Sequence, residues 1–262
     1  MFEEIRIENG QCSATVIPQR GGLISELEIG ARPLLYLDRS TVEDRSKSVR
    51  GGIPVLFPFA GKLDDDRLAL TDTVIPQHGF ARNKPWSIIE QSASAVKIAL
   101  EGDEDAQRQY PFDFVVEQTV TAEPDGLRVE LQVVNRDSRP MPISPGWHPY
   151  FLCPASGKST VETDLQARPE DRFSNDREFD FGIPAPANGL VNLEIPGSGL
   201  ITLGFSPEMR HLQFWSQPGK NFICVEPFWG PANSINTEQR GSVQSQTDGD
   251  RLVWMNLRVG SG

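Results

Sequence analysis

The chain has 262 residues, of which 38% are hydrophobic and 23% charged, and its formal net charge is −11. A chain of this length can bury a full core, either in one large β domain or in two small domains. The negative charge argues against nucleic acid and anionic membrane as partners, because both repel an acidic surface.

The N-terminal residues, Met1 to Arg6, contain neither the basic segment nor the apolar run of a signal peptide. No stretch approaches the roughly 18 apolar residues of a membrane span. The three cysteines, Cys12, Cys153 and Cys224, are far apart and odd in number, which argues against a disulfide framework. A reduced, cytoplasmic location fits such cysteines best.

Residues 3–37 alternate apolar and polar side chains between glycine turns, the pattern of half-buried strands. Residues 38–50 are polar and charged. Residues 51–62 are apolar but carry two prolines, which a regular central strand does not tolerate, so we expect an irregular buried crossing. The acidic run at 64–66 lacks the spacing of a calcium loop and is interpreted as a solvated turn.

From residue 86 the sequence is strongly β, with turns expected at 102–107 and 124–126. Residues 154–200 indicate loops with short strands. The longer strands are expected at residues 86–91, 95–100, 114–122, 127–135, 201–205, 212–216, 221–225 and 252–259. We find no amphipathic helix longer than two turns, no repeat and no linker. The sequence therefore predicts one all-β domain of packed sheets over residues 1–262.

One candidate catalytic histidine, His148, lies between a tryptophan and a Pro-Tyr-Phe run, and Pro149 restricts its backbone. A histidine titrates near neutral pH, so in a concave aromatic setting it is a candidate acid or base. The alternative is a core histidine hydrogen-bonded to backbone.

Two further motifs contribute candidate polar groups. His78 and Arg82 flank the small residue Gly79, and they could either face a ligand or close a loop. Glu226 ends the apolar strand expected at 221–225 and has no basic neighbour in sequence. Burying it without a partner would be costly. If it shares a cleft with His148, the two form an acid/base pair of different pKa, but the sequence does not show that they meet.

Four motifs together carry a resemblance to a known family. They are Gly-Gly-Ile-Pro at 51–54 with Phe-Pro at 57–58, Pro-Gln-His-Gly-Phe-Ala-Arg at 76–82, Gly-Trp-His-Pro-Tyr-Phe at 146–151 and Val-Glu-Pro at 225–227. In this order they closely resemble the aldose 1-epimerase, or galactose mutarotase-like, family. The resemblance implies a β-supersandwich of large twisted antiparallel sheets with an open sugar cleft.

The resemblance also implies roles. His148 matches the family's general acid, Glu226 its general base and His78 its sugar-binding histidine. Glu226 would take the proton of the anomeric hydroxyl while His148 protonates the ring oxygen. The ring then opens, the C1–C2 bond rotates, and reclosure gives the other anomer. Both steps are proton transfers, so no cofactor and no metal is expected.

The chain departs from the family pattern at Gly61-Lys62, where many members have Asn-Arg, and lysine does not replace a bidentate arginine. Arg50 and Arg82 instead resemble the hexose-6-phosphate mutarotase branch. With Lys62 they could hold a phosphate by charge-assisted bonds. The family's sugar-binding aspartate is matched to Asp176. The expected ligand is an aldohexose or a hexose 6-phosphate, and the oligomeric state is left open.

The main alternative is a carbohydrate-binding or regulatory module on the same fold. Retention of both His148 and Glu226 favours the enzyme. A lyase or glycoside-processing domain of similar shape ranks below both, because it would need further acid/base residues such as a cleft tyrosine. The chain has only Tyr36, Tyr110 and Tyr150.

Overall fold

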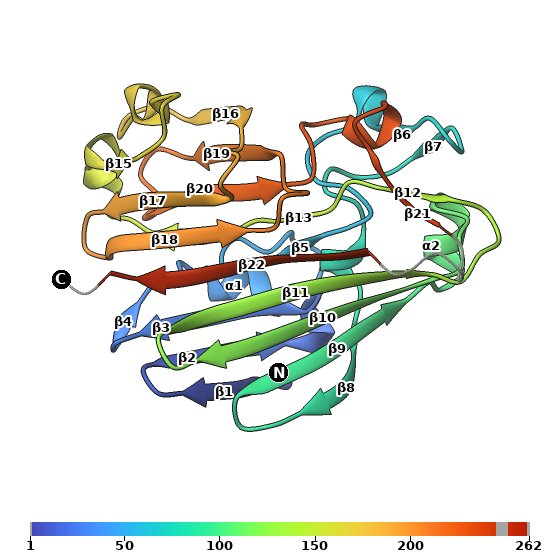
Figure 1. Cartoon of the computed structure of the whole chain (residues 1–262), viewed down its shortest axis with the longest axis horizontal. Coiled ribbons are helices and arrows are strands. Elements are labelled where there is room, and N and C mark those ends of the chain that lie inside the picture. Colours follow the sequence, from blue (N-terminus) through green and yellow to red (C-terminus); the bar gives the residue numbers. More distant parts are fainter. Residues whose placement is uncertain (1, 245–250, 261–262) are drawn as a thin grey trace.

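The computed structural model describes residues 2–244 and 251–260. Within them the protein is built from large antiparallel sheets with few, short helices, which confirms the predicted all-β class (Figure 1). The ends of the predicted domain, Met1 and residues 261–262, lie outside the described residues. The single-domain assignment stays a prediction. None of the helices in the described part of the chain could cross a membrane.

The largest sheet has eight strands in the order β15-β17-β18-β22-β11-β10-β9-β8. Its strands are β8 (Ser87–Gln91), β9 (Ala95–Glu101), β10 (Phe114–Glu123), β11 (Gly126–Asn135), β15 (Glu162–Thr163), β17 (Leu190–Ile195), β18 (Gly199–Phe205) and β22 (Arg251–Val259). The bounds of the six strands that the sequence located match closely, because alternation of apolar and polar residues is strong in most of them. Strands β15 and β17 lie in the segment predicted as loops with short strands.

A second sheet of four strands covers one face of the first (Figure 1). It comprises β1 (Ile5–Asn9), β2 (Cys12–Ile17), β3 (Leu23–Ile29) and β4 (Arg32–Pro33). Strands β1 and β2 pack against β10. The inward side chains of both sheets are fully buried, so the main core lies between the two layers.

A third sheet has the order β16-β19-β20-β13-β5, with β14 also paired to β20. Its strands are β5 (Val55–Leu56), β13 (Gly146–Trp147), β14 (Tyr150–Leu152), β16 (Phe179–Pro184), β19 (His211–Ser216) and β20 (Phe222–Phe228). Two small pairs complete the fold, namely β6 (Arg67–Leu68) with β7 (Thr73–Val74) and β12 (Met141–Ile143) with β21 (Gly241–Val243).

The segment at 51–62 is the irregular buried crossing that its prolines predict. Only β5 in it is regular, and single bridges join Phe57 to Gly79 and Phe59 to Ser144. A Cβ on Gly79 would stand 2.3 Å from the carbonyl oxygen of Phe57, so the close approach requires glycine there. This crossing ties the His78 loop to the third sheet.

Two short helices and one strand end differ from the sequence predictions. The turn expected at 102–107 contains helix α2 (Glu104–Gln109), because Asp103 caps it by accepting a hydrogen bond from the backbone N–H of Ala106. Asp38 caps α1 (Arg39–Glu43) in the same way through Ser40. Strand β20 continues to residue 228, so Glu226 lies inside the strand rather than at its end.

Candidate active site

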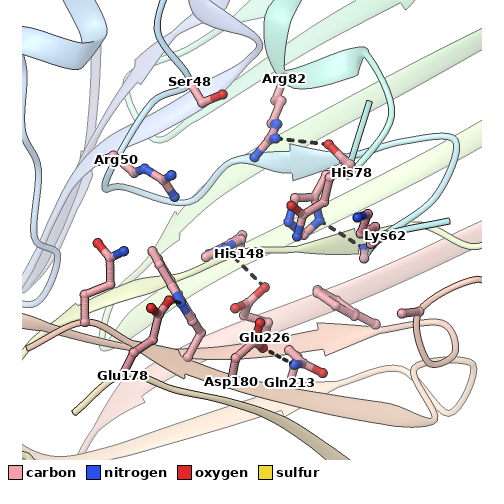
Figure 2. A pocket seen from close by; sticks show the side chains of 16 residues that line it. Ser48, Arg50, Lys62, His78, Arg82, His148, Glu178, Asp180, Gln213 and Glu226 are labelled. Atoms are coloured by element: carbon pink, nitrogen blue, oxygen red, sulfur yellow. Dashed lines mark hydrogen bonds and ion pairs between the residues drawn. The ribbon is translucent and has the colours of Figure 1, made fainter. Parts of the chain in front are cut away.

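A cavity of about 380 Å³ opens beside β20, β19 and β16, and loops around residues 48–50, 61–62 and 77–82 close its other sides (Figure 2). Six of the seven predicted site residues line it: Arg50, Lys62, His78, Arg82, His148 and Glu226. Segments far apart in the sequence therefore meet at one place.

Strand β20 places Glu226 in this cavity. All seven of its residues are buried. Ile223 and Val225 enter the main core, so the alternating residues Cys224 and Glu226 face the opposite side. A strand buried on both faces thus presents one carboxyl group to the cavity.

The neighbouring strand β13 and the buried crossing place His148. Gly146 pairs with Phe228 of β20 on one side and with Leu56 of β5 on the other. The backbone N–H of His148 donates to the carbonyl oxygen of Pro54 at 3.1 Å. The imidazole stacks on the ring of Tyr150 at a centroid distance of 4.6 Å and an angle of 12°. Of the aromatic neighbours in sequence, only Tyr150 stacks on the imidazole, whereas Trp147 and Phe151 pack in the main core.

The two candidate acid/base residues meet. The Nε2 atom of His148 lies 3.4 Å from Oε2 of Glu226 (Figure 2), and the residues are only 5% and 1% exposed. The ring of His148 thus faces a carboxyl group on a cavity wall, and its catalytic role stays a prediction.

Burial shifts the two pKa values in opposite directions. Burial, and then the charge of Asp180, hold the pKa of Glu226 well above its ordinary value. Burial, and then the Arg82 guanidinium, hold the pKa of His148 well below its ordinary value. Both charged forms are disfavoured, so the arrangement favours one proton on the pair, and burial favours its placement on Glu226.

His78 both closes a loop and lines the cavity. Its backbone N–H donates to the carbonyl oxygen of Gly61 at 2.8 Å, and the N–H of Gly61 donates to its Nδ1 at 3.0 Å. Burial and Arg82 keep its pKa well below the ordinary value. Because Nδ1 accepts, the neutral ring carries its proton on Nε2. The ring lies 5.4 Å from that of His148. It can offer a donor to a ligand.

The arginines of the cavity have no carboxylate partner within the described residues. Arg82 is half-buried, donates through Nη2 to the carbonyl oxygen of Gln77 at 3.0 Å, and has a buried Nε without a partner. Arg50 lies over the ring of Trp215 at 5.3 Å. Lys62 differs, because it is exposed and pairs with Asp66 at 3.8 Å.

The predicted aspartate is corrected by the structure. Asp176 is exposed in the turn before β16 and does not line the cavity. Asp180, two residues into β16, lines it instead, because its neighbours Phe179 and Phe181 turn into the core. The amide of Gln213 donates to Asp180. The alternation of acidic and aromatic residues at 178–181 is the sequence signal that would have found Asp180.

Glu178 was also missed and lines the same wall (Figure 2). It accepts a hydrogen bond from Nε1 of Trp215 at 2.8 Å. His211, the third histidine, contacts Oε1 of Gln213 at 3.0 Å. The wall opposite the arginines is therefore a set of hydrogen-bond acceptors and amides held by neighbouring strands.

Comparison with known proteins gives a consistent result. The family model described as aldose 1-epimerase matches residues 3–186. A protein of Cenchrus ciliaris named "Putative glucose-6-phosphate 1-epimerase" is 28% identical over 254 residues, which cover 82% of this chain and 74% of that protein. A protein of Escherichia coli K12 with the same name is 29% identical over 116 residues, or 43% of this chain and 37% of that protein.

Solved structures share the fold over the whole chain. A protein from Synechocystis sp. PCC 6803 superimposes with a TM-score of 0.90 at 29% identity, covering 100% of this chain and 97% of that one. A galactose mutarotase related enzyme from Lactobacillus acidophilus gives a TM-score of 0.80 at 18% identity, with 99% and 98% covered. The second likeness shows the fold alone, and it agrees with the predicted supersandwich.

Proposed function

Since the chain belongs to the aldose 1-epimerase family, a family of isomerases, we propose that it interconverts the α and β anomers of a hexose 6-phosphate. The observation that carries the proposal is the buried His148–Glu226 pair, 3.4 Å apart. The same cavity is faced by two guanidinium groups that have no carboxylate partner in the part of the chain that the structure describes. The pair supports the proton transfers of ring opening, and the guanidinium groups support binding of the substrate's phosphate.

Opening a hemiacetal ring requires one proton to leave the anomeric hydroxyl and one to reach the ring oxygen. A pair that holds one proton can do both, because one member accepts while the other donates. In the proposed roles Glu226 accepts the hydroxyl proton and His148 protonates the ring oxygen. After rotation about C1–C2, reclosure reverses both transfers, and the pair returns to its starting state.

These roles require the proton on His148, whereas burial favours it on Glu226. The two forms have the same proton count and the same net charge, and they differ by one proton moved across the 3.4 Å gap. The proton therefore moves from Glu226 to His148 before His148 donates to the ring oxygen and Glu226 accepts from the anomeric hydroxyl. The essential property is the single shared proton.

The charges around the pair support a phosphorylated sugar. Arg50 and Arg82 lie on one side of it and Glu178 and Asp180 on the other (Figure 2). A phosphate would be attracted to the first side and repelled from the second. A guanidinium fork matches phosphate oxygens, and the buried Nε of Arg82 has a free donor to offer. Sugar hydroxyls can donate to the acidic side.

Exchange NMR between the two anomeric protons tests the proposal at equilibrium. The protein is added to glucose 6-phosphate, glucose and galactose, and the exchange rate is compared with that in buffer. We expect the highest kcat/KM for glucose 6-phosphate, with an advantage that falls at high salt as screening grows. A preference for free galactose would contradict the proposal that the substrate is phosphorylated. If the protein bound a sugar but accelerated anomer exchange of none, the alternative of a non-catalytic carbohydrate-binding module would be favoured.

A further inference from the structure

The mechanism leaves one buried nucleophilic group beside the acid/base pair unused. Cys224 stands two residues before Glu226 on β20, on the same face, and is fully buried. One ligand atom from each of His148, Cys224 and Glu226 lies within 4.8 Å of the other two. A nitrogen, a sulfur and an oxygen donor therefore converge behind the cavity wall, which His148 and Glu226 line and Cys224 does not.

We propose that these three side chains form a binding site for a thiophilic divalent cation, with Zn²⁺ as the best-fitting ion. Zinc is held in proteins by these three donor types, at about 2.3 Å from sulfur and about 2.0–2.2 Å from nitrogen and oxygen. Ligand atoms around a tetrahedral ion then stand roughly 3–4 Å apart. The 3.4 Å between His148 and Glu226 already meets this, and a ligand atom of Cys224 lies within 4.8 Å of both.

Unpartnered atoms give a second reason. Oε2 of Glu226 and Nδ1 of His148 are buried without a hydrogen-bond partner. Buried polar groups are usually satisfied, so an unpaired carboxyl oxygen next to a nitrogen and a sulfur is an unfilled coordination position. Oε2 is also the atom that faces Nε2 of His148, so the two would bind the ion from either side.

The local charge balance permits a cation in spite of the two arginines. One thiolate and one carboxylate offset the charge of a divalent ion, so the filled site is neutral. The sulfur binds a cation as the thiolate, so Cys224 would release its proton when the ion binds. Mg²⁺ is a poor competitor, because it prefers oxygen ligands in octahedral geometry.

The effect on activity rests on the proposed function. An ion bound to Nε2 of His148 and to the Glu226 carboxylate occupies the electron pairs that would accept protons. His148 and Glu226 also line the cavity that the sugar is proposed to enter. Zinc should therefore inhibit competitively with the sugar and be reversed by a chelator, so the ion is an inhibitor and not a cofactor.

Cobalt titration of the reduced, full-length protein tests the site without reference to activity. Co²⁺ bound to a thiolate gives a near-ultraviolet charge-transfer absorption, and added Zn²⁺ should remove it. Cys224→Ser should abolish this band and weaken zinc binding at least about tenfold, comparable with losses of other metal-site groups. Cys12→Ser and Cys153→Ser are matched controls, because both residues are also buried free cysteines and should leave the band unchanged.

The outcomes separate the two proposals. No band in the wild-type protein, a band retained in Cys224→Ser, or a band lost in a control variant overturns the metal site, whatever the activity. A band that depends on Cys224, without zinc inhibition of an active enzyme, upholds the site and contradicts the acid/base roles. If Cys224→Ser does not fold, Glu226→Gln removes a second ligand and should weaken cobalt binding instead. Mg²⁺ at the same concentration should have no effect.

Discussion

Strands β11 and β20 lie in the same molecule, are both antiparallel and are both rich in apolar residues, yet they differ in what their second face meets. Along β11, every second residue from Leu127 to Val133 is buried in the core, and the residues between them are half-exposed. Along β20 all residues are buried, and the second face holds Cys224 and Glu226. Strand β11 contributes buried side chains to the core alone, whereas β20 contributes them to the core on one face and to the site on the other.

The difference shows where this fold accepts an unfavourable burial. Charged residues of β11, such as Glu130, remain partly exposed and pair with a neighbour, here Arg128 at 3.1 Å. Glu226 has lost water and faces a histidine whose charged form burial also disfavours. Burying such a carboxyl group lowers the stability of the fold. In return, the pair holds a proton that moves easily between its two members.

The largest expected effect lies in the kinetics of the cavity. His148→Asn and Glu226→Gln should each lower kcat by about 10²–10⁴-fold with the fold intact, because general acid–base groups contribute roughly that much. Anomer exchange by NMR and circular dichroism measure the two properties. Glu130→Gln on β11 is the control and should leave kcat unchanged. Near wild-type exchange in either folded cavity variant would remove that residue from the mechanism.

The core strand should show the opposite behaviour. Leu131→Ala on β11 should lower the free energy of unfolding by about 2–5 kcal/mol, because it leaves a cavity in a fully packed core. Its kcat per folded molecule should be unchanged. Denaturant unfolding and kinetics at low temperature test this, with half-exposed Val134→Ala as the milder control. A fall in kcat at full folding would show that the two regions are coupled.

The third effect separates phosphorylated from free sugar. Arg82→Ala should lower kcat/KM for glucose 6-phosphate by about 10–100-fold, since a hydrogen bond to a charged group contributes about 1.5–3 kcal/mol. The loss on free glucose should be smaller. Arg136→Ala removes an exposed arginine paired with Glu101 and serves as the control. Equal losses on both sugars would make Arg82 a structural residue and place the chain among epimerases of free sugars.

The smallest effect is a gain in stability. Glu226→Gln should raise the free energy of unfolding near pH 7 by about 0.5–2 kcal/mol, because it removes a poorly solvated carboxyl group. The pKa of Glu226 is raised in the folded protein, so its unfavourable contribution is absent below the ordinary value of 4.5 and grows as pH rises above it. Melting temperatures at pH 5 and pH 7 measure this. A gain that is larger at pH 5 would contradict the raised pKa.

Much of the sheet framework follows from the sequence. Alternation placed β9, β10, β11 and β22 within one or two residues of their observed ends, because apolar periodicity on half-buried strands is a local property. It failed at α2, where one capping aspartate outweighed a turn-like composition. It also ended β20 too early, because packing on both faces carries the strand through Pro227.

For the site, the sequence by itself determined which residue types were available. Motifs around His78, His148 and Glu226 identified them, because unusual residues in apolar or proline-rich settings are visible locally. The choice of Asp176 was wrong, since which acidic residue of a loop and strand faces a cavity depends on the register of β16 against β19. Register is fixed by the core residues Phe179 and Phe181, not by the acidic ones.

Only the tertiary structure decided that His148 and Glu226 meet, that Arg50 and Arg82 have no carboxylate partners among the described residues, and that Cys224 lies beside the pair. The first of these facts shows the scale, because His148 and Glu226 are 78 residues apart in the sequence and are brought together by the sheet. The shifted pKa values follow from the same packing, because desolvation depends on what surrounds a group in space. The local sequence determines where strands form and which residues are candidates for the site. The distances between these residues and their burial are decided only when the sheets assemble.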